Sequence, residues 1–269
     1  MFVTRIAILI VGLLCAYAPL ALADDTSPWR LGIAVGYGER SNPLVAADDI
    51  SLLADIDLAW FGKRFYFDNG DVGVTLMNND KFTLSLAARA NSDRVFFGRT
   101  NSRVVSLSPD ALPTGAPTNL QITVPDRRYA IEAGLELLAD GRWGRLQASM
   151  HHDISGTHDG FELSADYSVG RRFGRLYVEP SLGLNYKSKA LNNYYWGVAA
   201  GEANPLLPAS VVGDGFNVRT SFRAGYYLSR RMALVVSAHI ERINSEAAAS
   251  VIVAEDTVKG YFAGLSMRL

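Results

Sequence analysis

Hydrophobic and polar residues alternate with a period of two along much of this chain. In residues 29–37 every odd position is large and apolar, while the even positions are Arg30, two glycines and an alanine. The same alternation returns at 52–60, 128–137, 161–169, 216–226 and 234–241. Successive side chains of a strand point to opposite faces, so the pattern predicts strands with one apolar and one polar face. The chain is therefore expected to be all-β.

Two architectures produce this alternation, and the lengths of the connections separate them. A soluble sandwich or lipocalin-like barrel buries its apolar face, whereas a transmembrane barrel turns that face toward lipid. The connections at 61–63, 78–80, 139–141, 172–174 and 229–231 are short. They alternate with 38–49, 68–70, 91–126, 153–159, 188–213 and 245–257, most of which are longer. Short periplasmic turns opposite longer extracellular loops are typical of outer-membrane barrels.

The number of strands follows from the same spacing. Twelve strands are predicted, with both ends of the barrel domain in the periplasm. The third and fourth strands, near 64–67 and 71–76, are shorter than the roughly 9–11 residues that cross a bilayer. Ten strands is therefore the alternative.

Aromatic residues stand at the ends of the predicted strands, where the interfacial girdles of a membrane barrel lie. They are Trp29, Tyr37, Trp60, Tyr129, Trp143, Phe161, Tyr186, Phe216, Tyr226 and Tyr261. The last segment, 259–269, also alternates and closes on Leu269. Barrels of this kind more often close on phenylalanine, so Leu269 is a departure from the usual terminal strand.

The first residues predict export. Residues 6–14 are an unbroken apolar run, and Ala21 and Ala23 supply the small residues of a cleavage site. We expect a signal peptide at 1–23 and one barrel domain at 24–269. Cys15, the only cysteine, falls inside the signal. The remaining chain then has no thiol or disulfide, and beyond the signal no apolar stretch approaches the length of a membrane helix.

Charge excludes one class of partner. The chain has 26 basic and 27 acidic residues and a formal charge of −1. No basic field of the size that nucleic acid requires is present, so nucleic acid is not expected as a partner.

Several short motifs resemble the MipA/OmpV family of outer-membrane proteins, also called MltA-interacting proteins. The most specific runs from Asn193 through Tyr194, Tyr195, Trp196, Gly197 and Val198, with Glu202 shortly after. Shorter matches lie at 64–68, 153–160, 180–184, 227–232, 241–245 and 264–266. The resemblance covers most of the chain after the signal and is densest from about residue 142 onward.

The resemblance implies an outer-membrane barrel that is not an enzyme and binds no cofactor. It implies outer-membrane lipids as surroundings and, as partners, a lytic transglycosylase and a bifunctional penicillin-binding protein linked in murein synthesis. Other members of the family are associated with adhesion and with stress responses. A small channel or adhesin acting through the lumen and the extracellular loops is therefore the alternative function. A lipid-modifying barrel enzyme is a third.

The polar faces of the strands predict a network of charges inside the barrel. Its expected members are Asp55, Asp57, Arg89, Arg128, Glu132, Glu136, Glu162, Asp166, Glu179, Arg219, Arg223, His239 and Glu241. About eight strands leave room only for side chains and about sixteen enclose a channel. Twelve strands leave both a salt-bridged lumen and a narrow pore open, and we favour the network.

Two further groups of residues suggest local roles. His151, His152, Asp153, Ser155, His158 and Asp159 have the residue types of a metal site or hydrolase. Adjacent strand residues point to opposite faces, so His151 and His152 cannot converge, and we interpret the segment as a solvated extracellular loop without catalytic or metal-binding residues. The aromatic motif at 194–196 fits either a carbohydrate or protein contact or a strand extension packed in the barrel mouth. We favour the packed strand.

Overall fold

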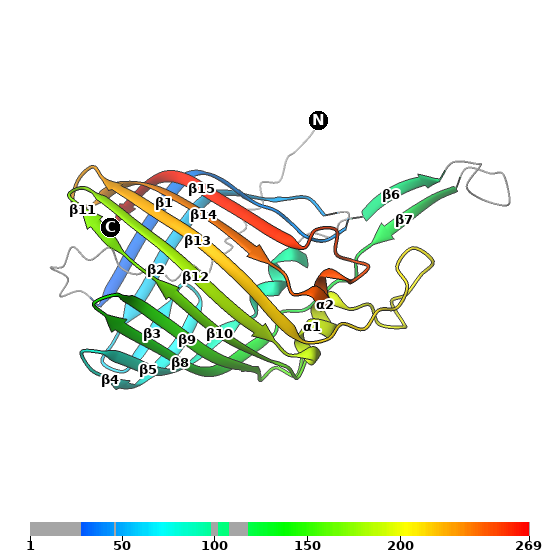
Figure 1. Cartoon of the computed structure of the whole chain (residues 1–269), viewed down its shortest axis with the longest axis horizontal. Helices are drawn as coiled ribbons and strands as arrows, with labels where there is room; N and C mark the ends of the chain where they lie inside the picture. Colours follow the sequence, from blue (N-terminus) through cyan, green and yellow to red (C-terminus); the bar gives the residue numbers. More distant parts are fainter. Residues whose placement is uncertain (1–27, 46, 98–101, 108–117, 269) are drawn as a thin grey trace.

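The computed structural model describes residues 28–45, 47–97, 102–107 and 118–268, which form a closed antiparallel barrel (Figure 1). The predicted signal peptide at 1–23 and the terminal Leu269 lie outside the described residues. The strands are β1 (Trp29–Arg40), β2 (Ile50–Phe61), β3 (Phe65–Asp68), β4 (Asp71–Asn78), β5 (Phe82–Ala90), β6 (Ser102–Leu107), β7 (Thr118–Thr123), β8 (Ile131–Gly141), β9 (Gly144–Asp153), β10 (Phe161–Ser168), β11 (Arg171–Phe173), β12 (Leu176–Lys187), β13 (Gly215–Tyr227), β14 (Met232–Arg242) and β15 (Thr257–Arg268).

Two strands share one place in the barrel wall, which sets the strand number. The sheet runs β10-β9-β8-β5-β4-β3-β2-β1-β15-β14-β13-β12-β11, and an additional pairing of β10 with β12 closes it. Both β10 and β11 run along β12, and between them the Val169 amide donates to the Pro180 carbonyl at 3.1 Å. The two therefore act as one interrupted strand. The wall has twelve strands, which confirms the predicted number over the alternative of ten.

The apolar faces of the strands point outward, as predicted for a membrane barrel. Leu163 and Val236 are 39% and 50% exposed, and large apolar side chains are exposed on nearly every wall strand. Their neighbours in sequence face the lumen. Glu162 is buried, and the Ser164 hydroxyl is 2.7 Å from that of Ser149 on β9. A soluble barrel would bury the apolar face instead, so the arrangement fits lipid outside and polar groups inside.

The hairpin of β3 and β4 is short and stops partway up the wall. Its tip is Asn69 (φ 51°) and Gly70 (φ 106°), and two positive φ values are what a type I′ turn requires. The Asn69 amide donates to the Leu58 carbonyl, and Asn69 Oδ1 accepts from the Leu58 amide, both at 2.9 Å. The tip thus ends the pairing at Leu58, although β2 continues to Ile50. The predicted shortness of these two strands is confirmed.

The long connections contain elements that periodicity did not predict. Strands β6 and β7 pair as a hairpin within the predicted loop at 91–126, and Figure 1 shows it projecting beyond the barrel. The same loop begins with a 3₁₀ helix, η1 (Ser92–Phe97). Two short helices follow later, α1 (Lys189–Trp196) and α2 (Ser245–Ala248). Among the described residues no helix is long and apolar enough to cross a membrane.

Candidate functional site

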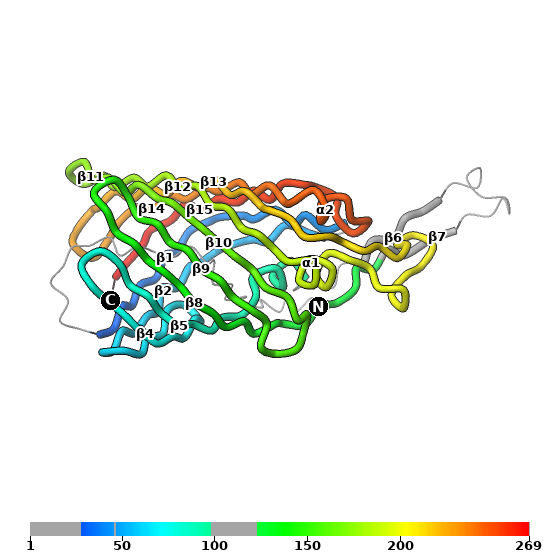
Figure 2. Tube along the Cα trace, turned by 60° about the horizontal axis from the view of Figure 1, so that its bottom comes forward, coloured from blue at the N-terminus to red at the C-terminus, as the bar shows by residue number. Residues whose placement is uncertain are grey.

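The hydrophobic core of this protein lies in one mouth of the barrel, because the lumen is polar. We call η1, α1 and α2 together the plug; both views place α1 and α2 at the end of the barrel where the long connections lie (Figures 1 and 2). The core residues come from the plug and the connections around it. They are Leu44, Phe96, Phe97, Val124, Leu191, Tyr195, Trp196, Val198, Leu207, Val212, Ile243, Ala247, Ile252 and Val258.

The aromatic motif of the sequence forms the centre of this core. Tyr195 and Trp196 are 0% and 2% exposed at the end of α1. The Trp196 ring lies 5.7 Å from that of Phe96 and 6.0 Å from that of Phe97, measured between centroids. The segment packs inside the barrel mouth, as the favoured prediction had it, but it is a helix and not the predicted strand extension. A helix brings both large rings into the mouth within one turn, which the alternating sides of a strand would prevent.

Arg127 joins the end of the motif to the connection before β8. Its guanidinium binds the Glu202 carboxylate in a bidentate manner, at 2.7 and 3.0 Å, and also donates to the Gly197 carbonyl at 2.9 Å. The hydrogen bond from Arg127 lowers the pKa of Glu202. Bidentate pairs of this kind fix geometry as well as charge, so Arg127 holds the chain as it leaves α1.

A buried ion pair ties the plug to the wall. Asp93 in η1 lies 2.5 Å from the Lys187 ammonium at the end of β12. Its second carboxylate oxygen accepts from the Trp196 indole at 3.1 Å. Burial raises the pKa of Asp93, while the Lys187 charge opposes that effect. One carboxylate thus connects η1, α1 and the barrel wall.

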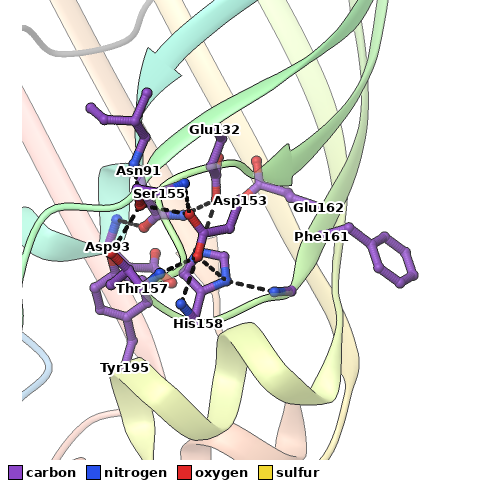
Figure 3. Close-up of polar contacts among 12 residues, drawn as sticks. Asn91, Asp93, Glu132, Asp153, Ser155, Thr157, His158, Phe161, Glu162 and Tyr195 are labelled. Atoms are coloured by element: carbon purple, nitrogen blue, oxygen red, sulfur yellow. Dashed lines mark hydrogen bonds and ion pairs between the residues drawn. The ribbon is translucent and has the colours of Figure 1, made fainter.

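The segment after β9 is folded around one carboxylate, as Figure 3 shows. Asp153 accepts hydrogen bonds from the backbone amides of Ser155, Thr157 and His158 at 2.6–2.8 Å. His158 is 7% exposed; its Nδ1 accepts from the Gly160 amide, and its Nε2 lies 3.4 Å from Glu132. The prediction of a solvated loop is therefore wrong for Asp153 and His158, because the amides of the turn satisfy a buried carboxylate.

The arrangement of these residues does not resemble a catalytic triad. His151 is buried in the wall and His152 is exposed, so the two point to opposite faces as predicted. The Ser155 hydroxyl donates to Asp153 at 2.6 Å, and no hydrogen bond between Ser155 and His158 is found in the described residues. Among the described residues, no group of three or more His, Cys, Asp or Glu residues is placed to hold a metal ion.

Charged residues of neighbouring and nearby strands pair on the lumen face of the wall. Arg89 lies 3.3 Å from Glu132 and 2.5 Å from Glu162, and the Asn91 amide donates to Glu132 at 2.6 Å. Further around the wall, Arg219 lies 2.8 Å from Asp166. Other contacts pair Arg223 with Glu179, Arg30 with Asp57 and Asp68, Asn217 with Glu241, and Glu136 with Tyr66 and His151.

One predicted member of the network lies elsewhere, and other residues were missed. Arg128 is exposed in the connection before β8, where its backbone amide donates to the Tyr194 hydroxyl at 2.9 Å. Asp55 and His239 are half-buried on the lumen face of their strands, and the His239 ring lies against Gly260 of the neighbouring β15. Arg30, Asp68 and the plug anchors Asp93, Lys187 and Arg127 were not predicted. Lys187 directly follows Tyr186, whose side chain faces outward. A strict period of two would therefore have placed the Lys187 side chain on the lumen face.

Comparison with known proteins agrees with the fold and the motifs. A model of the family described as MltA-interacting protein MipA matches residues 31–269. The putative outer membrane protein YiaT of Escherichia coli strain K12 is 24% identical over 251 residues, which are 91% of this chain and 87% of YiaT. Omp26La of Vibrio anguillarum and OmpV of Vibrio cholerae are 26% and 25% identical over 163 residues. Those matches cover 59% of this chain and 63% of each relative.

Solved structures of outer-membrane proteins are also similar at low identity. A FadL homologue of Pseudomonas aeruginosa matches with 9% identity over 90% of both chains and a TM-score of 0.38. OmpT of Vibrio cholerae matches with 7% identity over 92% of this chain and 99% of its own, with a TM-score of 0.36. The family model covers most of the sequence, and the relatives are outer-membrane proteins. This chain is an outer-membrane β-barrel that belongs to the MltA-interacting protein MipA family.

Proposed function

We propose that this barrel is a non-enzymatic scaffold at the periplasmic face of the outer membrane. Its partner would be a lytic transglycosylase of the MltA type, which the family description names, and through it a bifunctional penicillin-binding protein. In this function the barrel holds a murein hydrolase beside a murein synthase. No group of the chain then needs to react with substrate.

The packed plug is the observation that supports this function. Fourteen buried residues fill the mouth on the side of the long connections, and the Asp93–Lys187 pair anchors them to the wall. A general diffusion channel needs an open path through the barrel. The plug stands in such a path at the mouth with the long connections. A periplasmic protein would therefore meet the barrel at the other mouth, which has the short turns.

An interface at the short turns has to use several of them together. The connection 142–143 between β8 and β9 and the connection 228–231 between β13 and β14 contain only a few residues each. A stable interface buries about 1,600 Å² in total, which no single turn supplies. A partner would therefore contact several turns around the barrel mouth, and single substitutions would weaken binding only modestly.

Capture of the transglycosylase by the purified barrel tests the proposal. The full-length mature barrel in lipid nanodiscs would be mixed with a soluble transglycosylase lacking its lipid anchor, and binding measured by interferometry. A variant with Gly141 and Gly174 each followed by an inserted Gly-Ser-Gly lengthens two turns, while the same insertion after Gly201 lengthens a long connection. We expect the first to weaken binding and the second to leave it unchanged. Absence of binding by the unaltered barrel would refute the scaffold function.

Contact at the cell surface is a second candidate function, which one observation favours. The hairpin of β6 and β7 projects beyond the barrel at the end opposite the short turns (Figure 1). An adhesin presents such a segment to its target. Removal of residues 102–123 would then abolish adherence of cells that carry the protein, while capture of the transglycosylase would persist.

A further inference from the structure

Charge is distributed unevenly between the two ends of the barrel. The short turns at 61–65, 78–82, 139–144, 169–176 and 228–232 contain nine basic and two acidic residues, an excess of seven positive charges. The described long connections at 41–45, 47–49, 91–97, 124–130, 154–160, 188–214 and 243–256 contain four basic and ten acidic residues. Because the excess charges at the two ends have opposite signs, the formal charge of the whole chain, −1, does not reveal this difference.

The nine basic residues of the short turns are exposed, and we call them the basic ring. They are Lys63, Arg64, Lys81, Arg142, Arg171, Arg172, Arg175, Arg230 and Arg231. Within the described part of the chain none of them forms an ion pair. Asp140, one of the two acids nearby, is paired with Arg145 at 2.7 Å instead. The ring therefore presents cations that no described acidic side chain neutralises.

Aromatic side chains place the ring at the level of lipid headgroups. Phe65, Trp143 and Phe173 each directly follow a member of the ring and are 64%, 67% and 62% exposed. The Arg142 guanidinium lies 4.6 Å from the centre of the Trp143 ring. Exposed aromatic residues at the end of a membrane strand lie in the interface between hydrocarbon and water. The adjacent arginines then stand beside the lipid phosphates.

We propose that the basic ring binds the phosphate groups of anionic phospholipids in the periplasmic leaflet. The ring involves all five short turns and so surrounds the barrel, as a shell of lipid does. Basic residues next to a membrane are attracted to anionic lipids, and short turns keep these residues near the membrane plane. The acidic connections at the other end make this attraction specific to one leaflet. The proposal does not depend on the scaffold function.

Lipid titration of the purified mature barrel tests the proposal. Phosphatidylglycerol or phosphatidylethanolamine would be added to the barrel in neutral detergent, and bound lipid counted by native mass spectrometry. A triple variant, Arg175→Gln, Arg230→Gln and Arg231→Gln, removes charges on adjacent turns. Its control, Arg128→Gln, Lys189→Gln and Lys259→Gln, removes three exposed charges at the other end. A heat-dependent shift on gels would verify that both variants fold.

We expect only the ring variant to lose affinity for phosphatidylglycerol. The unaltered barrel and the control should bind phosphatidylglycerol more tightly than phosphatidylethanolamine. The ring variant should lose roughly tenfold or more in phosphatidylglycerol affinity. Equal affinity of the unaltered barrel for the two lipids, or an unchanged affinity in the ring variant, would overturn the proposal. If the ring variant instead loses only transglycosylase binding, the ring belongs to the protein interface and the lipid assignment is wrong.

Discussion

At the scale of single residues, the plug is held by a few buried polar side chains whose partners are far away in the sequence. Asp93 and Lys187 are 94 positions apart, and Arg127 and Glu202 are 75 apart. Alternation within a strand indicates which side chains face the lumen, and it found Glu132, Glu162 and Asp166. It does not indicate which helix or loop enters the mouth to meet them. The anchors of the plug therefore could not be predicted from the pattern alone.

The Asp93–Lys187 pair should be strongly destabilising to break and much less so to remove. Lys187→Met leaves the Asp93 charge buried without its partner, and we expect a loss of about 3–5 kcal/mol in the free energy of unfolding. Asp93→Asn combined with Lys187→Met removes both charges of the pair, and the amide oxygen can still accept from the Trp196 indole. The double variant should recover a large part of the loss. Urea titration of the barrel in micelles measures both, and equal losses in the two variants would contradict the role of the pair.

The direction of each wall side chain can be tested at two adjacent residues. Leu163 on β10 faces outward, and Ser164 faces the lumen. Arginine near the middle of the bilayer costs about 2–4 kcal/mol on the lipid face of a barrel. We therefore expect Leu163→Arg to destabilise the barrel in liposomes by roughly that amount and Ser164→Arg clearly less. A reversed order in urea titrations would mean that the strand faces the other way.

At the scale of elements, the wall strands could be predicted and the elements of the mouth could not. The wall strands have a repeating apolar face because each crosses lipid, and even the short β3–β4 hairpin was visible in the spacing. Helix α1 is eight residues long, and its buried residues Leu191, Asn192, Tyr195 and Trp196 are partly polar. Such a short segment gives little helical periodicity, and its helical form depends on tertiary contacts in the mouth. The same holds for η1, which the core of the plug and the Asp93–Lys187 pair stabilise.

The tip of the β3–β4 hairpin depends on glycine at one position. Gly70 has a φ of 106°, and no atom lies within 4 Å of the position that a Cβ would occupy. Gly70→Ala therefore tests backbone strain without a steric clash, and we expect a loss of about 1–3 kcal/mol. Gly141→Ala is the control, because its nearest neighbour would be 3.7 Å from the Cβ and it lacks a positive φ. Urea titration should show little change in the control, and similar losses in both would implicate packing instead of φ.

At the scale of the whole molecule, the two ends of the barrel differ in the length of their connections, in charge and in closure. One end has short turns and the basic ring. The other has long connections, the plug and most of the exposed acidic residues. The predicted signal peptide and the lengths of the connections predicted which end faces the periplasm, since both can be read from the sequence alone. The closure of one mouth could not be predicted, because it depends on contacts among four separate connections.

The orientation of the barrel decides whether the proposals about its two ends can hold, and cysteine labelling tests it. The chain after residue 23 contains no cysteine, so a single introduced thiol reports its own position. Gly201→Cys lies in an exposed long connection where no atom is within 4 Å of the position of a Cβ, and Arg230→Cys lies in a short turn. A maleimide coupled to a polymer too large for porins should label Gly201→Cys in intact cells. It should label Arg230→Cys only after the outer membrane is permeabilised.

The two outcomes of this labelling have different consequences for function. Labelling of Arg230→Cys in intact cells, with Gly201→Cys protected, would place the short turns on the cell surface. The basic ring would then face the lipopolysaccharide side, and a periplasmic transglycosylase would meet the plugged mouth. Labelling of both thiols in intact cells would indicate a damaged membrane, which a periplasmic marker enzyme in the medium reveals. The expected pattern instead puts the nine cations of the basic ring on the side where inner-leaflet phospholipids and murein enzymes both lie. In that orientation the barrel can bind lipid and partner together. Lipid binding by the basic ring fixes the height of the short turns relative to the membrane, and the partner binds to those turns.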